Sequence, residues 1–309
     1  MRTTQKILFI TANRVGDAVL TTGLLSWLEK KYPDASFTIA CGPYGADLFR
    51  AVPRLERLIV MKKKKWNGHW FDLWKTCIGT KWDLIVDMRN SLASRFLYAK
   101  KFAAHSQSRG KHKVVENAAV LKVSPPPNPH IWITPEAEKE ADKLVPKGAT
   151  VLALGPAANW PLKQWPIQHF IILVTALTAP GGLMQDASVM ILADKHERDQ
   201  IEPLLKSIPD GKRIEIIGRD LQTAAACLKR ARLYVGNDSG LMHMSAALGT
   251  PTIGLFGPVY IGEHCDFVTT PENREELMTR LANSKIPPKT LMDNLSVERV
   301  VEAAKKLLA

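Results

Sequence analysis

Short apolar runs alternate with amphipathic stretches along the first half of the chain. Residues 6–11 (KILFIT) are mostly apolar and end in a polar loop, after which Leu20, Leu24 and Leu28 recur at helical spacing. Such a run predicts a buried strand, and such spacing predicts a helix that covers it. The same order returns after three further runs: SFTIAC (36–41), RLIVM (57–61) and WDLIVDM (82–88). Strands that alternate with helices predict a parallel, doubly wound α/β sheet.

The second half of the chain repeats this alternation. Its apolar runs are TVLALG (150–155), ASVMILA (187–193), RIEIIG (213–218), RLYVG (232–236) and TPTIGLFG (250–257). A length of 309 residues also exceeds the usual size of one core. We therefore expect two Rossmann-like domains in tandem.

Two proline-rich segments separate the halves. VSPPPNP (123–129) is the stronger break and VPKG (145–148) the second. The expected domains are residues 1–147 and 148–309. A last amphipathic stretch, residues 296–308, begins with a serine cap and can pack on either domain.

The excess positive charge lies entirely in the N-terminal half. The formal net charge is +12; residues 1–148 hold 25 Lys and Arg against 13 Asp and Glu, and the remainder holds 17 of each. This asymmetry fits a domain that faces a nucleic acid, a phospholipid surface or a phosphorylated acceptor. A basic face that is merely solvated explains the same numbers.

Composition excludes several classes of protein. No apolar run approaches the roughly 18 residues that span a bilayer, and residues 1–17 lack the apolar core of a signal peptide, so we expect a cytoplasmic protein. The four cysteines, Cys41, Cys77, Cys227 and Cys265, are far apart and lack ligand spacing. This argues against a disulfide framework and against structural zinc, and predicts reduced, buried thiols.

Polar residues gather at one predicted helix start. Open α/β sheets bind ligands beyond the carboxyl ends of their strands. There, GNDSGLMHMSAALGTP (236–251) places Asp238, Ser239 and Gly240 between a strand and a helix, where free amides and the helix dipole suit a phosphate. His243 shares a helix face with Ser239 and can donate to a phosphate or a sugar hydroxyl. A simple cap by Ser239 or Asp238, with His243 in the core, is the alternative interpretation.

Two more loops follow predicted strands. TANRVGDAVL (11–20) has one glycine, so the GxGxxG dinucleotide fingerprint is absent. Asp17 begins the next helix there, either as an N-cap or as a general base. In GPAANWPLKQWPIQHF (155–170), Lys163 lies in a loop restrained by prolines and Trp165. It suits a cation that meets a leaving phosphate, or a lysine that serves solubility alone.

A basic and aromatic stretch lies at residues 61–75 (MKKKKWNGHWFDLWK). Trp66, Trp70 and Trp74 are spaced by four, which places them on one helix face if a helix begins near residue 66. Such a stripe is more typical of a core than of a contact surface. The four lysines beside it, Lys62, Lys63, Lys64 and Lys65, suit acidic lipid head groups.

Three of these motifs, in this order, resemble those of the heptosyltransferases of lipopolysaccharide core synthesis, glycosyltransferase family 9. Residues 13–35 (NRVGDAVLTTGLLSWLEKKYPDA) are similar to the family's Gly-Asp loop and first helix. LKQWP (162–166) is similar to its Lys-x-Trp-Pro loop, and residues 236–258 to its donor-site signature. The resemblance implies a GT-B fold, with two Rossmann-like domains that face each other across a cleft. The N-terminal domain then holds the acceptor and the C-terminal domain the nucleotide-sugar.

The resemblance also implies a reaction. Family members transfer L-glycero-D-manno-heptose from ADP-heptose with inversion and without a metal. Asp17 matches the general base, and Lys163 matches the lysine that faces the donor phosphates. The donor-binding signature around the heptose and diphosphate is matched by Asp238, Ser239, Gly240 and His243. No DxD pair is placed to bind a cation, so no metal or other cofactor is expected.

The match has departures. Asn13 and Arg14 stand where several family members carry small hydroxyl residues. In DKHERD (194–199), Glu197 is the candidate acidic residue for the adenosine ribose. The lysines at 62–65 are candidates for an acceptor-binding or membrane-binding surface.

The leading hypothesis is an inverting, metal-independent transferase that adds heptose to the inner core of lipopolysaccharide. Its partners are a nucleotide-sugar, an anionic lipopolysaccharide-precursor acceptor and the inner face of the cytoplasmic membrane, where the protein is peripheral. Three alternatives stay open: another nucleotide-sugar donor, a later branching acceptor, or a non-catalytic GT-B binding module. A nucleic-acid binder has only the charge in its favour, because the chain contains no recognised nucleic-acid motif, so no nucleic-acid partner is expected.

Overall fold

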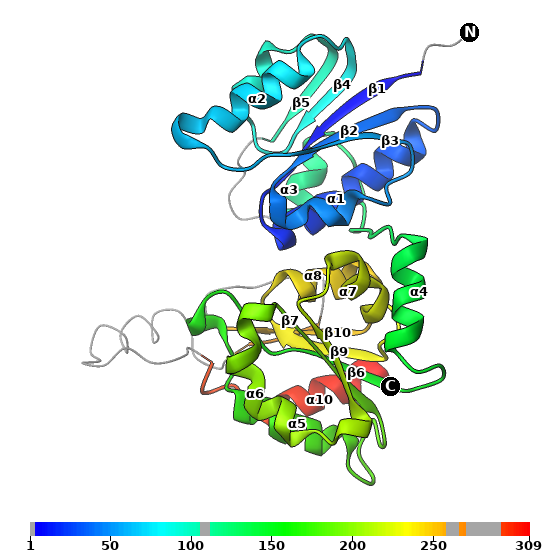
Figure 1. The fold of residues 1–309 in the computed structure, drawn as a ribbon, viewed down its shortest axis with the longest axis vertical. Coiled ribbons are helices and arrows are strands. Elements are labelled where there is room, and N and C mark those ends of the chain that lie inside the picture. Colours follow the sequence, from blue (N-terminus) through cyan, green and yellow to red (C-terminus); the bar gives the residue numbers. More distant parts are fainter. Residues whose placement is uncertain (1–3, 106–111, 258–265, 270–291) are drawn as a thin grey trace, which may run out of the picture. The chain divides into compact units, whose positions relative to one another are not determined.

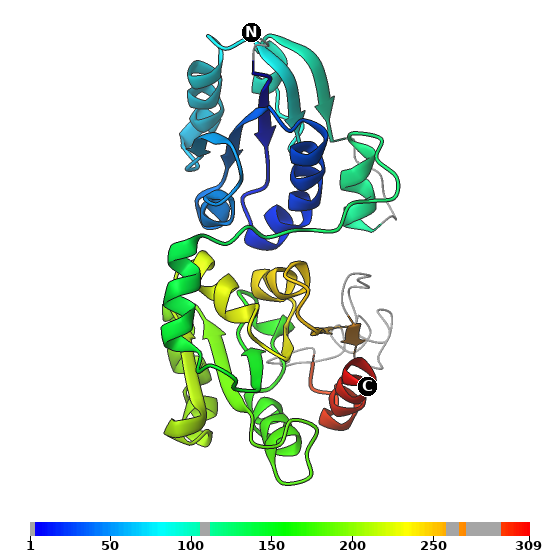
Figure 2. The same cartoon turned by 90° about the vertical axis from the view of Figure 1, so that its right-hand side faces the viewer.

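The computed structural model describes residues 4–105, 112–257, 266–269 and 292–309, which form two α/β units (Figure 1, Figure 2). The first unit is Met1–Thr134 and the second is Pro135–Ala309. Each unit has a parallel sheet with helices packed on it, so the α/β class expected from the alternating pattern is confirmed. Over these described ranges, no helix is long and apolar enough to cross a membrane.

The first unit contains a five-stranded parallel sheet in the order β3-β2-β1-β4-β5. Its strands are β1 (Lys6–Ile10), β2 (Ser36–Cys41), β3 (Leu55–Val60), β4 (Trp82–Asp87) and β5 (Ala99–Ala104). Its helices are α1 (Val15–Lys31), α2 (Gly68–Cys77) and α3 (Lys113–Ala119), with 3-10 turns η1 (Pro43–Phe49), η2 (Lys65–Asn67) and η3 (Ala93–Phe96).

Helices cover the two faces of this sheet differently. Leu73 of α2 packs in one buried cluster with Leu8 and Ile10 of β1, so α2 covers the face on which those side chains point. Helix α1 contacts α3 and lies on the other side of the sheet (Figure 1, Figure 2). This arrangement buries β1 almost completely, as expected for the central strand of a parallel sheet.

The expectation that three tryptophans share one helix face is wrong for Trp66. Trp70 and Trp74 lie on α2 and pack against the core of the first unit, as the stripe predicts. Trp66 lies in η2 with a left-handed backbone (φ 54°, ψ 27°), before α2 begins at Gly68. The left-handed turn at Trp66 and Asn67 breaks the helical register, and the Trp66 side chain is 99% exposed.

The second unit contains a six-stranded parallel sheet in the order β11-β10-β9-β6-β7-β8. Its strands are β6 (Val151–Gly155), β7 (Ser188–Ala193), β8 (Arg213–Ile217), β9 (Leu233–Asn237), β10 (Thr252–Phe256) and β11 (Asp266–Thr269). Its helices are α4 (Pro135–Leu144), α5 (Ile167–Thr178), α6 (Arg198–Ser207), α7 (Leu221–Leu228), α8 (Gly240–Ala247) and α10 (Val297–Leu308). Its 3-10 turns are η4 (Pro161–Lys163), η5 (Lys195–Glu197) and η6 (Asp210–Lys212).

Helix α4 belongs to the second unit, although the sequence pattern places the boundary after it, near residue 147. Ala137 and Ala141 are buried where α4 packs on α7. Arg230 adds two ion pairs, to Glu138 at 2.8 Å and to Asp142 at 2.7 Å. These contacts join α4 to the second sheet, so the compact units divide between Thr134 and Pro135.

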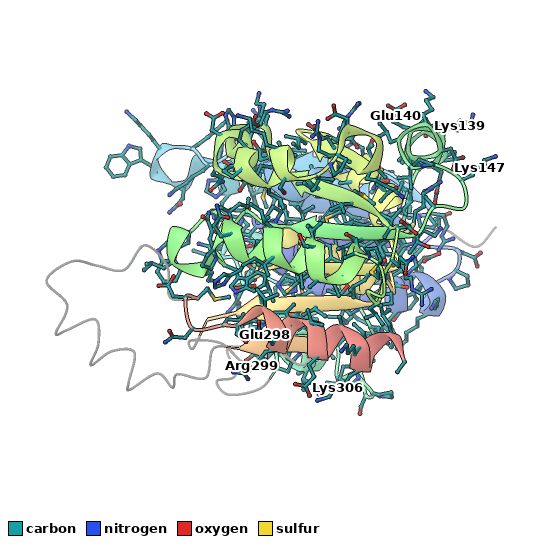
Figure 3. The ribbon with its side chains drawn as sticks, turned by 90° about the horizontal axis from the view of Figure 1, so that it is seen from below. Lys139, Glu140, Lys147, Glu298, Arg299 and Lys306 are labelled. Carbon is teal, nitrogen blue, oxygen red and sulfur yellow. The ribbon has the colours of Figure 1, made fainter. Side chains whose placement is uncertain are left out.

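The last helix, α10, packs within the second unit. Val300 and Ala304 lie in the same buried cluster as Leu173 and Leu177 of α5. Its charged side chains Glu298, Arg299 and Lys306 point outward from the helix (Figure 3). The sequence allowed this helix to pack on either domain, and in the structure it packs on the C-terminal one.

Candidate functional site

The second sheet reverses its strand order between β6 and β9. The chain runs from β6 outward through β7 to β8, and then returns to build β9, β10 and β11 on the other side. Gly155 and Gly236 are register partners near the carboxyl ends of these two central strands. Ligands of open α/β sheets bind at such a switch point, between the two loops that leave the strands. One loop carries Lys163 and the other carries Asp238 and Ser239.

Asn237 ties these two loops together. This fully buried residue accepts a hydrogen bond from the Trp165 backbone N–H (3.0 Å) and donates one to the Pro156 carbonyl (2.7 Å). Trp165 is buried too, and its Nε1 donates to the Leu295 carbonyl (2.8 Å). Lys163 therefore lies two residues before Trp165, whose position is fixed by these hydrogen bonds. The sequence did not reveal this role of Asn237, because its partners are about 70 to 80 residues away.

The structure brings three of the expected residues together. The Lys163 ammonium forms an ion pair with Oδ2 of Asp238. The other carboxylate oxygen, Oδ1, lies 3.7 Å from Nε2 of His243. The Lys163 side chain is 40% exposed, whereas Asp238 and His243 are largely covered. This geometry orients a cation at the edge of the sheet and leaves it accessible to a ligand.

Ser239 occupies the N-cap position of α8, but its side chain does not cap the helix. The Ser239 Oγ is buried and has no hydrogen-bond partner among the described residues. A capping serine would satisfy one of the free amides at the start of the helix. The simple capping interpretation is therefore wrong for Ser239. The first amides of α8, beginning at Gly240, keep their capacity to bind an anion.

We expect Ser239→Ala to leave the free energy of unfolding unchanged within about 0.5 kcal/mol, because no side-chain bond is lost. Asp220→Ala is the matched control. Asp220 caps α7 through bonds to the Gln222 and Thr223 amides, so its loss should cost about 1–2 kcal/mol. Urea unfolding of both variants measures the difference. An equal loss in the two variants would show that Ser239 is an ordinary cap.

Glu197 has a local structural role. It follows β7, which neighbours β6 on the side away from β9. In a capping box, Glu197 Oε2 accepts from the Asp194 N–H (2.8 Å) and Asp194 accepts from the His196 N–H. Burial raises the pKa of Glu197, a shift that the bond from Asp194 opposes. The expected ribose contact of Glu197 stays a prediction.

In the first unit, Asp17 is the third residue of α1, and the N-cap is Arg14. The N-cap interpretation of Asp17 is therefore wrong. Its carboxylate is exposed and has no hydrogen-bond or ion-pair partner in the part of the chain that the structure describes. A carboxylate in the first turn is favoured by the helix dipole and is free to meet a ligand.

Arg89 is a candidate site residue that the sequence pattern missed. The first sheet reverses its order between β1 and β4, so the loops that follow these strands are neighbours. Arg89 Nη1 donates to Asn13 Oδ1 (3.0 Å), and the guanidinium stacks on Trp70 with its carbon 4.6 Å from the ring centroid. Burial lowers its pKa. No ion-pair partner for its side chain is found within the described ranges.

The loop that carries Arg89 is held by Asp87 at the end of β4. This fully buried carboxylate accepts bonds from the Arg89 and Ser91 amides (2.8 and 2.7 Å) and from the hydroxyls of Ser91 and Ser94 (2.6 and 2.7 Å). Four donors on one carboxylate fix the loop closely. Arg89 thus projects from a rigid turn beside the loop that leads to Asp17.

The lysine run is exposed along its whole length, from Lys62 to Lys65. Lys64 pairs with Asp72 in the middle of α2 at 2.6 Å, which ties the run to that helix. The other three lysines have no ion-pair partner among the residues described. They form a positive surface beside α2.

Neither a metal site nor a reactive thiol emerges from the described residues. Over those ranges, no three His, Cys, Asp or Glu side chains are grouped to hold a metal ion. Cys41, Cys77 and Cys227 are free and buried, and burial raises the pKa of the Cys77 and Cys227 thiols to about 11. Cys265 lies outside the described residues.

Two tandem parallel α/β units, each with polar groups at its switch point, are typical of the GT-B class of glycosyltransferases. The family model of glycosyltransferase family 9 (heptosyltransferase) matches residues 99–264, more than half of the chain. The chain belongs to this family and is a glycosyltransferase.

Individual relatives agree with this assignment. Lipooligosaccharide heptosyltransferase 2 of Haemophilus influenzae is 22% identical and is matched over 82% of this chain and 83% of its own length. The glycosyl transferase family 9 structure from Veillonella parvula has a TM-score of 0.76 at 21% identity, covering 98% of this chain and 97% of that one. The E. coli heptosyltransferase WaaC with ADP-2-deoxy-2-fluoro heptose has a TM-score of 0.72 at 18% identity, covering 98% and 99%. These likenesses confirm the expected GT-B fold.

Proposed function

We propose that this chain is an inverting, metal-independent heptosyltransferase that moves heptose from ADP-heptose to the inner core of lipopolysaccharide. Its acceptor is an anionic precursor held in the membrane, and the enzyme works as a peripheral protein at the inner face of the cytoplasmic membrane. Two similarities support the donor and the acceptor: the WaaC structure contains an ADP-heptose analogue, and the H. influenzae relative is named for lipooligosaccharide.

The observation that carries the proposal is the cluster at the switch point of the second sheet. Lys163, the uncapped start of α8 and the unpartnered Ser239 Oγ offer a cation, amides and a hydroxyl at one place. A nucleotide diphosphate needs these three kinds of partner. Asp238 and His243 add an acceptor and a ring N–H for the hydroxyls of the sugar, and Glu197 is assigned to the ribose.

The proposed chemistry is a single displacement. Asp17 takes the proton of the acceptor hydroxyl, and that oxygen attacks the anomeric carbon of heptose on the face opposite the diphosphate. A new C–O bond forms while the bond to the phosphate oxygen breaks, so the configuration inverts and ADP leaves. Lys163 and the α8 amides stabilise the negative charge that develops on ADP, the task that a metal ion performs in other transferases.

Arg89 is proposed to bind an anionic group of the acceptor, because its half-buried guanidinium forms no ion pair among the described residues and the nearby Asp87 carboxylate is already bonded within its own loop. We expect Arg89→Ala to raise the acceptor KM about 10- to 100-fold, the loss of a charged hydrogen bond, and to leave ADP affinity unchanged. Steady-state kinetics at saturating donor measure the effect. Arg50→Ala, which removes an exposed arginine of the same unit, is the matched control. A parallel loss of ADP affinity in Arg89→Ala would contradict the assignment.

Thermal shift against a nucleotide panel tests the donor class. ADP, UDP, GDP, CMP and ADP-heptose are compared with and without EDTA. A ligand specific for the folded state adds about 2.7 kcal/mol at about 100 times its Kd. We expect ADP to stabilise the protein, ADP-heptose to stabilise it further, and EDTA to change neither result. Selective stabilisation by another nucleotide would show that the donor carries that nucleotide instead of ADP. A loss of the thermal shift in EDTA would contradict metal independence.

A further inference from the structure

Five large apolar side chains of the first unit are exposed to solvent on α2, on η3 and its N-cap residue, on β5 and in the turn before α2. They are Trp66 (99% exposed), Phe71 (62%), Leu92 (70%), Phe96 (66%) and Phe102 (41%). Single exposed apolar residues are common on soluble proteins, but a group of large ones marks an interaction surface. None of the five is used by the proposed reaction.

Contacts in the structure connect the elements that carry three of these side chains, Phe71, Phe96 and Phe102. The rings of Phe71 and Trp74 stack with centroids 5.6 Å apart, and Trp74 Nε1 donates to the Phe96 carbonyl at 3.4 Å. The residue before Phe96, Arg95, lies over the ring of Phe102 at 5.6 Å. These contacts link α2 to η3, and η3 to the edge strand β5, which lies beside α2 in Figure 1.

The strand register puts Phe102 on the same face of the sheet as α2. Phe102 pairs with Ile85, which pairs with Leu8, and side chains of register partners in parallel strands point to the same face. Leu8 and Ile85 both pack in the buried cluster of α2. Phe102 is thus the part of this face that α2 leaves uncovered at the sheet edge.

Trp66 contributes through an unusual backbone conformation. A bulky residue with positive φ is an outlier that costs about 1–3 kcal/mol, and Trp66 (φ 54°) is followed by Asn67 (φ 58°) in the same conformation. The turn is held on its other side by the ion pair of Lys64 with Asp72. Its effect is to present the indole to solvent beside the lysine run.

The charges around these side chains are strongly positive. Residues 62–102 contain ten Lys and Arg and three Asp, a net of +7. All three aspartates are already engaged: Asp72 with Lys64, Asp83 with Lys100, and Asp87 within its own loop. Among the described residues of this segment, the charged side chains outside these contacts are therefore lysines and arginines.

We propose that Trp66, Phe71, Leu92, Phe96 and Phe102, together with the lysines at 62–65, form a docking surface for an anionic phospholipid bilayer. Aromatic side chains favour the head-group level of a membrane, and nearby lysines are attracted to acidic lipids. A second copy of the chain fits poorly, because a two-fold interface would bring the same positive charges together. The inference rests on the proposed function only in that the acceptor is held in a membrane.

Vesicle sedimentation of the full chain tests the proposal. The protein is mixed with vesicles of phosphatidylcholine alone, or of equal parts phosphatidylcholine and phosphatidylglycerol. We expect binding to the anionic vesicles that weakens with added salt, and little binding to the neutral ones. The double variant Trp66→Ala with Phe71→Ser should bind about tenfold more weakly, since both side chains are exposed and their loss leaves the core intact. Neutralising Lys62, Lys63 and Lys65 together as glutamines should weaken binding about fivefold per lysine.

Matched controls test whether the loss of binding depends on where the substituted residues lie or only on the type of substitution. Ile172→Ser with Leu183→Ser removes two exposed apolar residues of the second unit, and glutamine at Lys139, Lys147 and Lys305 removes three exposed charges there. Lys139 and Lys147 are labelled in Figure 3. Both controls should bind vesicles as the unaltered protein does. Equal loss in a control and its test variant would overturn the assignment of the surface.

A second readout distinguishes this proposal from the proposed function. Trp66→Ala with Phe71→Ser should keep full transfer to a deacylated, water-soluble acceptor and lose transfer to acceptor embedded in vesicles. Vesicle binding needs neither donor nor acceptor, so a protein that binds vesicles without transferring heptose would refute the proposed function alone. No binding of the unaltered protein to anionic vesicles, or retention on single-stranded DNA in their place, would overturn the docking surface.

Discussion

Asp17→Asn should lower kcat about 10²- to 10⁴-fold and leave the affinity for ADP-heptose unchanged. The asparagine keeps the shape of the side chain but cannot take a proton, so the loss falls on the transition state. Asp17 is exposed, has no hydrogen-bond or ion-pair partner among the described residues, and stands in the first turn of α1 at the carboxyl end of β1. Steady-state kinetics together with donor titration separate kcat from binding.

The competing explanation is structural. As a first-turn carboxylate, Asp17 stabilises the helix by about 0.3–1 kcal/mol through the helix dipole. Asp34→Asn, an exposed carboxylate beyond the other end of α1, is the matched control and should keep full activity. If the kcat of Asp17→Asn stays within a few-fold of the unaltered protein, or falls only in step with the folded fraction, Asp17 is not the base.

Lys163→Ala should weaken donor binding and also lower kcat, by about 10²–10³-fold in rate. In the proposed mechanism the ammonium contacts the diphosphate in the ground state and meets more charge as ADP leaves, so both constants should change. The ion pair with Asp238 is 40% exposed at the lysine and contributes only about 0–1 kcal/mol to stability. A thermal melt of the variant without ligand should therefore be almost unchanged.

Two further variants control for side effects. Lys163→Met keeps the length of the side chain and should behave like the alanine variant, because the charge is what matters. Asp238→Asn frees Lys163 from its carboxylate partner but keeps the cation, so ADP itself should bind no more weakly than before. Normal ADP-heptose affinity in Lys163→Ala would remove this lysine from the phosphate site.

The sequence predicted the central strands well because both sheets are parallel and those strands are buried. Strands β6, β9 and β10 appear as nearly continuous apolar runs and are buried along their full length. The edge strand β5 (AKKFAA) is partly exposed and contains two lysines, so no apolar run marks it. The domain boundary was harder to place. The proline segments mark both ends of α4, and only its packing on α7 assigns that helix to the second unit.

The site was predictable where its residues follow strands in local motifs. Lys163, Asp238 and His243 were expected from their loops, and the structure brings them together. Arg89 was not predictable in this way, because its importance depends on β4 lying next to β1, a pairing that the chain order does not state. The unpartnered Ser239 Oγ was hidden for a similar reason, since cap geometry depends on the backbone and not on residue type.

Transfer of heptose by the purified protein tests the central claim most directly. ADP-heptose is incubated in EDTA with a lipopolysaccharide precursor that lacks heptose, and the product is weighed by mass spectrometry and its anomeric configuration read by NMR. The account predicts one added heptose, with configuration inverted relative to the donor, and release of one ADP for each sugar. No transfer from ADP-heptose to any inner-core acceptor, in a protein that transfers a sugar from another nucleotide, would contradict it.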